Sequence, residues 1–178
     1  AIISEISSRD LRLKAIYNAN VATISTIEGD DELLIKLILN AKNEGRERSN
    51  FINELCEQHK TDDKTLFYPF VHSLLRIIGL ECTGEVGRYD AYASYNGHII
   101  PVEIKSYTET ASYNIKGIRQ SIENKICSYN PCLTDDIDYA TLVVGYSHPV
   151  LDNDIRGMIN TAYEKFRIKI IATNIKSL

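Results

Sequence analysis

The chain has no run of apolar residues that approaches the roughly 20 needed to span a membrane, and no basic-then-apolar leader stands at its start. We therefore expect a cytoplasmic protein. The first residue is alanine rather than methionine, so a complete subunit and an excised domain both stay open.

An excess of basic residues is missing as well. The 20 lysine and arginine residues are outnumbered by 24 acidic ones, which gives a net charge of −4. Domains that hold DNA or RNA alone by neutralising phosphates usually carry a strong basic excess. Any nucleic acid must therefore be held locally, or with the help of another module.

The cysteines do not form metal-binding pairs. None of the four stands in a Cys-x-x-Cys pair, and the four histidines do not complete a zinc-ligand spacing with them. We expect reduced, partly buried thiols. The cysteines are Cys56, Cys82, Cys127 and Cys132, and the histidines are His59, His72, His98 and His148.

What the chain does contain is enough apolar material for one core. Its 178 residues are 44% hydrophobic, and there is no internal repeat, low-complexity segment or shift in composition that argues for a second domain. We predict a single domain over residues 1–178, with a helical N-terminal part at 1–60 and the main core at 61–178.

Helical spacing of apolar residues dominates the first half of the chain. An acidic start at Asp30 precedes apolar residues that recur every third or fourth position, and we predict several helices before residue 60. The pattern repeats from Phe67 to Ile78 and stops at Gly79, a residue that favours a helix C-terminus. Pro69 either lies in the first turn of this helix or kinks it.

The period then changes from helical to alternating, which predicts strands between Glu81 and Tyr107. Helical spacing returns from Asn114 to Tyr129. The stretch YATLVVGY, Tyr139 to Tyr146, is a continuous apolar run, as expected of a strand buried on both faces of a sheet. A helix from Asp152 to Phe166 and a strand from Arg167 to Thr173 follow. This order predicts an α/β fold, with an antiparallel hairpin and parallel strands in one mixed sheet flanked by helices.

The stretch RYDAYASYNGHIIPVEIKSY, residues 88–107, places three charges within apolar strands. The Asn-Gly pair at 96–97 predicts a hairpin, because a type I′ turn needs positive φ at both positions. With that pair as the loop, Asp90 lies opposite Glu103 in a non-hydrogen-bonded pair, with Cβ atoms about 5 Å apart. Lys105 projects from the same face, because side chains alternate along a strand. The three charges therefore converge.

The other face of the hairpin is apolar, which supports this register. A slip by one residue would bury the charges and expose the aliphatic side chains. Pro101 falls in a non-hydrogen-bonded pair with Tyr92, where it needs to donate nothing. The residues expected on the core-facing side are Tyr89, Ala91, Ala93, Tyr95, Ile100, Val102 and Ile104.

Two carboxylates about 5 Å apart repel by roughly 1 to 3 kcal/mol, so a positive partner should offset them. Lys105 does part of this in a simple salt-bridged surface cluster. A divalent cation such as Mg²⁺ does more, because it takes converging hard oxygen ligands. The local motif Asp/Glu-x-Lys says little alone, since it occurs as DDK at 62–64, EIK at 103–105 and ENK at 123–125. EIK differs in following a hairpin turn, with an acid placed opposite.

An acid on one strand, Glu-x-Lys on the next, and then a helix and a buried strand resemble the PD-(D/E)xK nuclease superfamily. EIKSYTETASYNIKGIRQ is similar to the D-x-K-A-Y, Y-N and Gln-bearing helix of cleavage domains in FokI-like type IIS restriction endonucleases. The resemblance covers residues 61–178 and departs from the family pattern in three places. Glu103 replaces the second aspartate, tyrosine replaces the proline before the first acid, and the segment between Lys105 and Gln120 is longer.

The resemblance implies a restriction-endonuclease-like core and a metal-dependent DNA endonuclease whose products carry 5′-phosphate ends. Asp90 and Glu103 would ligate Mg²⁺, for which Mn²⁺ substitutes, with help from the Ile104 carbonyl. Lys105 would orient or deprotonate the attacking water and offset charge that develops on the phosphate. Gln120 would hold that water or the DNA backbone, and the alternative is a plain solvated helix face.

Several nearby residues have two open interpretations. Phosphate contacts and ordinary exposed residues are both possible for Tyr113, Lys116, Arg119 and Lys125. Glu85 is either an additional acid or a surface residue, and we expect His98, beside the turn, to be exposed.

One such active site cuts one DNA strand, so cleavage of a duplex requires a homodimer or a heterodimer with another catalytic subunit. The acidic net charge fits a cleavage module that a separate recognition domain delivers to double-stranded DNA, as in prokaryotic restriction-modification. Two alternatives stay open. One is a RecB-like or resolvase-type nuclease of the same superfamily, and the other is a non-catalytic module for dimerisation or DNA docking.

Overall fold

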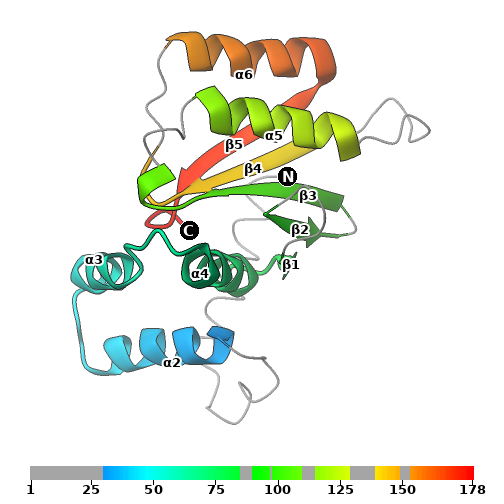
Figure 1. Ribbon diagram of the computed structural model, residues 1–178. Helices are drawn as coiled ribbons and strands as arrows, with labels where there is room; N and C mark the ends of the chain where they lie inside the picture. The colour runs from blue at the N-terminus through cyan, green and yellow to red at the C-terminus, as the bar shows by residue number, and fades with distance from the viewer. Residues whose placement is uncertain (1–29, 85–89, 97, 110–114, 129–138, 149–152) are drawn as a thin grey trace.

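The computed structural model shows a five-stranded mixed sheet with helices on both faces (Figure 1), which confirms the α/β class. The residues that the structure describes are 30–84, 90–96, 98–109, 115–128, 139–148 and 153–178. Among the helices in these ranges, none combines the length and the apolar composition that a membrane crossing requires.

Three described helices precede the sheet in the chain. α2 covers Asp30–Asn43, α3 covers Arg48–Gln58 and α4 covers Lys64–Ile77. α4 lies against the sheet, and α2 packs on the outer side of α4 (Figure 1). Asp31 of α2 accepts two hydrogen bonds from the Arg76 guanidinium of α4, at 2.5 and 2.6 Å. This ion pair joins the outer helix to the rest of the molecule.

The ends of α4 follow from local sequence. Asp63 caps its N-terminus, because the Asp63 carboxylate accepts a hydrogen bond from the Thr65 N–H at 2.8 Å. At the other end Gly79 adopts a φ of 99°, in the left-handed region where a Cβ would clash. Pro69 lies inside the helix and past its first turn, where its missing N–H removes one helical hydrogen bond.

The sheet changes pairing direction at its middle strand. β1 pairs antiparallel with β2, and β2 with β3, whereas β3, β4 and β5 are parallel neighbours. The bounds are β1 Glu81–Thr83, β2 Ala91–Tyr95, β3 His98–Lys105, β4 Tyr139–Gly145 and β5 Ile168–Asn174. The mixed sheet predicted from the order of strands and helices is therefore confirmed, with β3 as the strand that has one antiparallel and one parallel neighbour.

Two crossover helices cover one face of the sheet. α5, Ile115–Ser128, lies between β3 and β4 in the chain, and α6, Asn153–Phe166, lies between β4 and β5. Both lie on one face of the sheet, opposite α3 and α4 (Figure 1). Their bounds agree closely with the helices predicted from apolar spacing at 114–129 and 152–166.

Each face of the sheet carries its own apolar cluster. The larger one joins α4 to the face formed by alternate residues of the hairpin, and the smaller one joins Ile118 of α5 and Ile155 of α6 to Val143 of β4. The predicted core-facing hairpin residues Ala91, Ala93, Tyr95, Ile100, Val102 and Ile104 all belong to or pack against the larger cluster, while Tyr89 lies outside the described residues. The thiols of Cys56 and Cys82 are free and buried, as expected, while Cys132 and the side chain of Cys127 lie outside the described residues.

The hairpin register agrees with the prediction. Ala91 pairs with Val102 and Tyr95 pairs with His98. At the turn Asn96 has a φ of 50°, the positive value that a type I′ turn requires, while Gly97 lies outside the described residues. The two strands are therefore aligned as the Asn-Gly turn and the alternation of side chains predicted.

The surroundings of the charges differ from the prediction. The register was expected to keep the charged face out of the core, but Glu103 is 1% exposed and Lys105 is 7% exposed. Glu103 is in register with Val143 of β4, so both side chains lie on the face that α5 covers. The sequence of the hairpin alone does not show which later segments of the chain pack over its charged side chains.

Candidate active site

The candidate site is built around the backbone of Ile104 in β3. Ala91 and Val102 form a hydrogen-bonded pair by the alternation that starts at the turn, so the N–H and C=O of Ile104 point to the same side, toward β2. Within the described residues β2 begins at Ala91. Both groups of Ile104 are bound by side chains.

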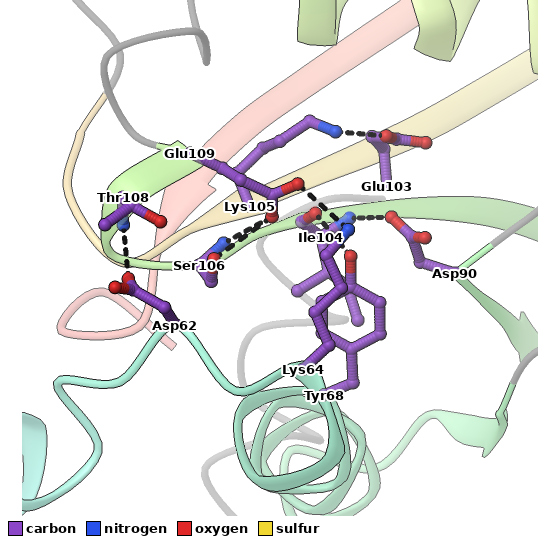
Figure 2. A network of polar contacts seen from close by, with 10 residues as sticks. All are labelled: Asp62, Lys64, Tyr68, Asp90, Glu103, Ile104, Lys105, Ser106, Thr108 and Glu109. Carbon is purple, nitrogen blue, oxygen red and sulfur yellow. Dashed lines mark hydrogen bonds and ion pairs between the residues drawn. The ribbon is translucent and has the colours of Figure 1, made fainter.

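Two side chains bind the Ile104 backbone from different elements. Asp90, one residue before β2, accepts a hydrogen bond from the Ile104 N–H at 2.7 Å. Tyr68 of α4, which is 4% exposed, donates its hydroxyl hydrogen to the Ile104 carbonyl oxygen at 3.4 Å. Figure 2 shows Asp90 and Tyr68 approaching Ile104 from different directions. One peptide segment is thus held by a carboxylate at its N–H and by a hydroxyl at its carbonyl.

Glu103 and Lys105 flank Ile104 on the strand. Their side chains point to the α5 face, because side chains alternate along β3, and the Lys105 ammonium lies 2.5 Å from Glu103 Oε1 (Figure 2). The salt bridge foreseen as an alternative to a metal site is therefore present, but it is buried rather than on the surface. Burial removes the water that would otherwise stabilise both charges.

The two acids of the site have unusual protonation behaviour. Burial raises the pKa of Glu103 to about 7, and the negative charge of Asp90 adds to this effect, while Lys105 opposes it. Burial also raises the pKa of Asp90, against the hydrogen bond from the Ile104 N–H and the charge of Lys105. Two carboxylates thus share the buried ammonium of Lys105, and its charge does not outweigh the effect of burial on either pKa.

A second polar group beside these residues was missed by the sequence-based prediction. Glu109 accepts hydrogen bonds from the N–H and hydroxyl of Ser106 at 3.2 and 3.1 Å, and pairs with Lys64 at 2.9 Å. Asp62 accepts a hydrogen bond from the Thr108 N–H at 2.9 Å. These contacts fasten the chain that leaves β3 to the start of α4 (Figure 2).

The DDK motif at residues 62–64 supplies two residues of this group, but the motif alone did not indicate their contacts. Asp62 and Lys64 are the two charged ends of the DDK motif, and both bind the segment after β3. Asp62 and Thr108 are 46 residues apart, so no local spacing reveals their contact. The spacing of Lys64 and Tyr68 does place them on one face of α4, because residues four apart on a helix are neighbours.

The remaining predicted residues lie on α5 or outside the described part of the chain. Gln120 is half-buried on α5, and the network drawn in Figure 2 does not include it. Lys116 and Arg119 are exposed on the same helix, as both open interpretations require. The structure does not describe Glu85, Tyr113, or the side chains of His98 and Lys125.

The groups that could hold a metal ion at this site are two carboxylates and one carbonyl. Within the described ranges no three His, Cys, Asp or Glu side chains gather closely enough to hold a metal ion. A cation would therefore be bound by Asp90, Glu103 and the Ile104 carbonyl oxygen, with water completing its shell. Such hard oxygen donors suit Mg²⁺, which keeps several waters in protein sites.

No protein-family model, curated protein sequence or solved structure matches this chain. The interpretation of its function therefore rests on the arrangement of Asp90, Glu103 and Lys105 around Ile104, and on the motifs that these residues form.

Proposed function

We propose that the chain is a metal-dependent endonuclease that hydrolyses DNA phosphodiester bonds on a restriction-endonuclease-like core. The observation that carries the proposal is the gathering of Asp90, Glu103 and Lys105 around the backbone of Ile104. Two acids and a carbonyl supply oxygen ligands for a hard cation, and the amine supplies a positive group for a phosphate. These are the groups that phosphodiester hydrolysis needs in one place.

The residues present fit Mg²⁺, and Mn²⁺ as its substitute. Burial raises the pKa of both acids, and a dication would oppose this effect by stabilising their charged forms. Asp90, Glu103 and the Ile104 carbonyl would hold the ion. When bound, it would polarise the phosphate and lower the pKa of water.

The protein's own contribution is the position of Lys105. Glu103 holds the ammonium beside the acids, so this group is already placed before DNA binds. From there Lys105 would orient the water that attacks phosphorus and offset the negative charge that develops on the phosphate oxygens. The leaving group would be the 3′ oxygen, so the products would carry 5′-phosphate ends.

The wider assignment is a cleavage domain or catalytic subunit of a type IIS restriction endonuclease. A net charge of −4 supports delivery to double-stranded DNA by a separate recognition domain, because the chain lacks a basic excess of its own. A single site cuts one strand, so a homodimer or a heterodimer with another catalytic subunit would cut the duplex. Gln120 would hold the water or the DNA backbone.

Cleavage of supercoiled plasmid tests the proposal. The protein should nick or cut the plasmid with Mg²⁺ or Mn²⁺ and lose this activity in EDTA. Lys105→Ala should abolish cleavage, and Lys105→Met, which keeps more of the buried volume, should do the same. Lys36→Ala is the matched control, because Lys36 is an exposed lysine of α2 paired with Glu32.

The products separate the related activities. Discrete double-strand breaks support a type IIS enzyme, progressive degradation supports a RecB-like exonuclease, and nicked junctions support a resolvase. Equal activity of the wild type and both Lys105 variants would remove the mechanism. A non-catalytic docking module would show no metal-dependent cleavage and no Mn²⁺ site lost in Asp90→Ala by calorimetry.

A further inference from the structure

α4 contributes the Tyr68 side chain to the candidate site. Tyr68 of α4 reaches the Ile104 carbonyl across 36 residues of sequence, with a donor–acceptor distance of 3.4 Å. The same residue of β3 is bound at its N–H by Asp90. Tyr68 and Asp90 therefore bind the C=O and the N–H of the same residue (Figure 2).

The chemistry of its neighbours sets the direction of the Tyr68 hydroxyl. The Lys64 ammonium lies 5.4 Å from the Tyr68 ring centroid, so a donor group stands beside this side chain. An ammonium can only donate and a carbonyl can only accept. The Tyr68 hydroxyl is therefore the donor to the Ile104 carbonyl, and its hydrogen points at that oxygen.

This arrangement leaves the carbonyl able to bind a cation. A carbonyl oxygen has two lone pairs, and Tyr68 uses one of them. A hydrogen bond on one lone pair restricts the orientation of the peptide group, so the second lone pair has a defined direction. Outer groups that hold a ligand in this way are a common part of metal sites.

Packing alone does not explain a tyrosine at this position. Phe67 and Phe70, its neighbours on α4, are buried in the larger apolar cluster without a polar group. A buried hydroxyl is unfavourable unless it has a hydrogen-bond partner, so phenylalanine would satisfy the packing at position 68 more simply. What the tyrosine adds to a phenylalanine is the hydrogen bond from its hydroxyl to the Ile104 carbonyl oxygen.

We propose that Tyr68 is a positioning residue, whose hydroxyl orients the Ile104 carbonyl so that this oxygen is prepared, with Asp90 and Glu103, to bind a divalent cation. This inference rests on the proposed nuclease function. It adds a residue from α4 that touches neither the cation nor DNA and acts through the backbone of β3.

The test is Mn²⁺ binding measured by calorimetry on the wild type, Tyr68→Phe and Tyr146→Phe, without DNA. Tyr146→Phe is the matched control, because it also removes one tyrosine hydroxyl, here bound to Glu57 at 3.3 Å. Tyr68→Phe should weaken Mn²⁺ binding by about tenfold, the lower end of the effect of losing an outer-shell partner. Tyr146→Phe should bind Mn²⁺ as the wild type does, and thermal unfolding without metal should show that both variants are folded at the temperature of the measurement.

The outcomes separate the two proposals. Wild type and Tyr68→Phe binding Mn²⁺ equally well would overturn the role of Tyr68 and leave the nuclease assignment standing. Equal weakening in both tyrosine variants would also overturn it, because the effect would then be a general loss of stability. A wild type that binds no Mn²⁺ would overturn the nuclease proposal and the role of Tyr68 with it.

Discussion

In two buried ion pairs of this molecule, the pKa values of the carboxylates are shifted in opposite directions. Between α2 and α4, Asp31 is 4% exposed and accepts two hydrogen bonds from Arg76. Burial raises the pKa of Asp31, but the hydrogen bonds of Arg76 and Ser73 outweigh it and leave that pKa below its ordinary value. At the candidate site, burial raises the pKa of Glu103 to about 7.

The difference lies in the balance of charge. One acid meets one bidentate guanidinium between the helices, so its charge is compensated and its role there is to hold two helices together. At the site neither Lys105 nor the hydrogen bonds compensate for the burial of the two acids. The charge of Asp31 is compensated by its partner, whereas the charged forms of the two site acids are not, which is consistent with the proposed binding of a cation.

The sharpest way to break this comparison is to remove one carboxylate from each cluster and measure plasmid cleavage. Glu103→Gln should lower the cleavage rate by about a hundredfold or more, because it removes a cation ligand and the partner of Lys105. Asp31→Ala should cleave at close to the wild-type rate below its unfolding temperature. A Glu103→Gln protein that cleaves normally would show that the Glu103 carboxylate is not needed for catalysis.

Stability should respond in the reverse order. Asp31→Ala should lower the free energy of unfolding by about 3 kcal/mol, at the low end for a broken buried pair, since the Arg76 side chain is 35% exposed. Glu103→Gln should change it much less at pH 7, because the lost carboxylate is itself destabilised by burial. Urea unfolding of both variants checks this, and a larger loss in Glu103→Gln would contradict the comparison.

The two clusters should also give opposite pH dependence in the metal-free protein. The folded-state pKa of Glu103 is raised from 4.5 to about 7, so between these values the folded protein binds more protons than the unfolded chain. Stability should therefore fall by roughly 2 to 3 kcal/mol as pH rises from 4.5 to 7. The lowered pKa of Asp31 acts the other way, since its stabilisation is lost as the pH falls through that pKa.

Glu103→Gln provides the control for this profile. Urea unfolding at a series of pH values should show the fall toward pH 7 in the wild type and a flatter profile in the variant. Adding Mg²⁺ at pH 7 should stabilise the wild type and leave Glu103→Gln nearly unchanged, because a ligand stabilises the state that binds it. If the wild type and Glu103→Gln gave identical stability profiles, the fall in stability toward pH 7 would not come from the raised pKa of Glu103.

The smallest effect is expected at the Lys64–Glu109 pair, a third ion pair that lies closer to water. The Lys64 side chain is 54% exposed, so Lys64→Met should lower the free energy of unfolding by less than about 1 kcal/mol. Urea unfolding in low and high salt checks this, since a loss that disappears in high salt is the mark of a screened surface pair. A loss as large as that of Asp31→Ala would mean that the pair is part of the buried core.

Much of the fold was predictable from short stretches of the chain. The Asn-Gly turn and the alternation of side chains predicted the pairing of Ala91 with Val102, and the structure has it. Apolar spacing predicted α5 and α6 closely. Such features depend on neighbouring residues, because a turn type needs particular φ angles and a helix repeats every 3.6 residues.

The candidate site was predictable only in part. Glu103 and Lys105 were expected on one face of β3 and are there, while Asp90 was expected in the ladder and instead lies just before β2, bound to the Ile104 N–H. Tyr68 gave no sign of its role. Its contact with Ile104 depends on how α4 packs on the sheet, which no local pattern records.

The sequence by itself determined which residues of β3 share a face and which of them are charged, because strand alternation and turn geometry are local properties of the chain. Only the tertiary structure decided that Glu103 and Lys105 would be buried and that α4 would bring Tyr68 to the Ile104 carbonyl. The reason is physical: burial and pKa depend on every segment packed around a group, and those segments come from distant parts of the chain.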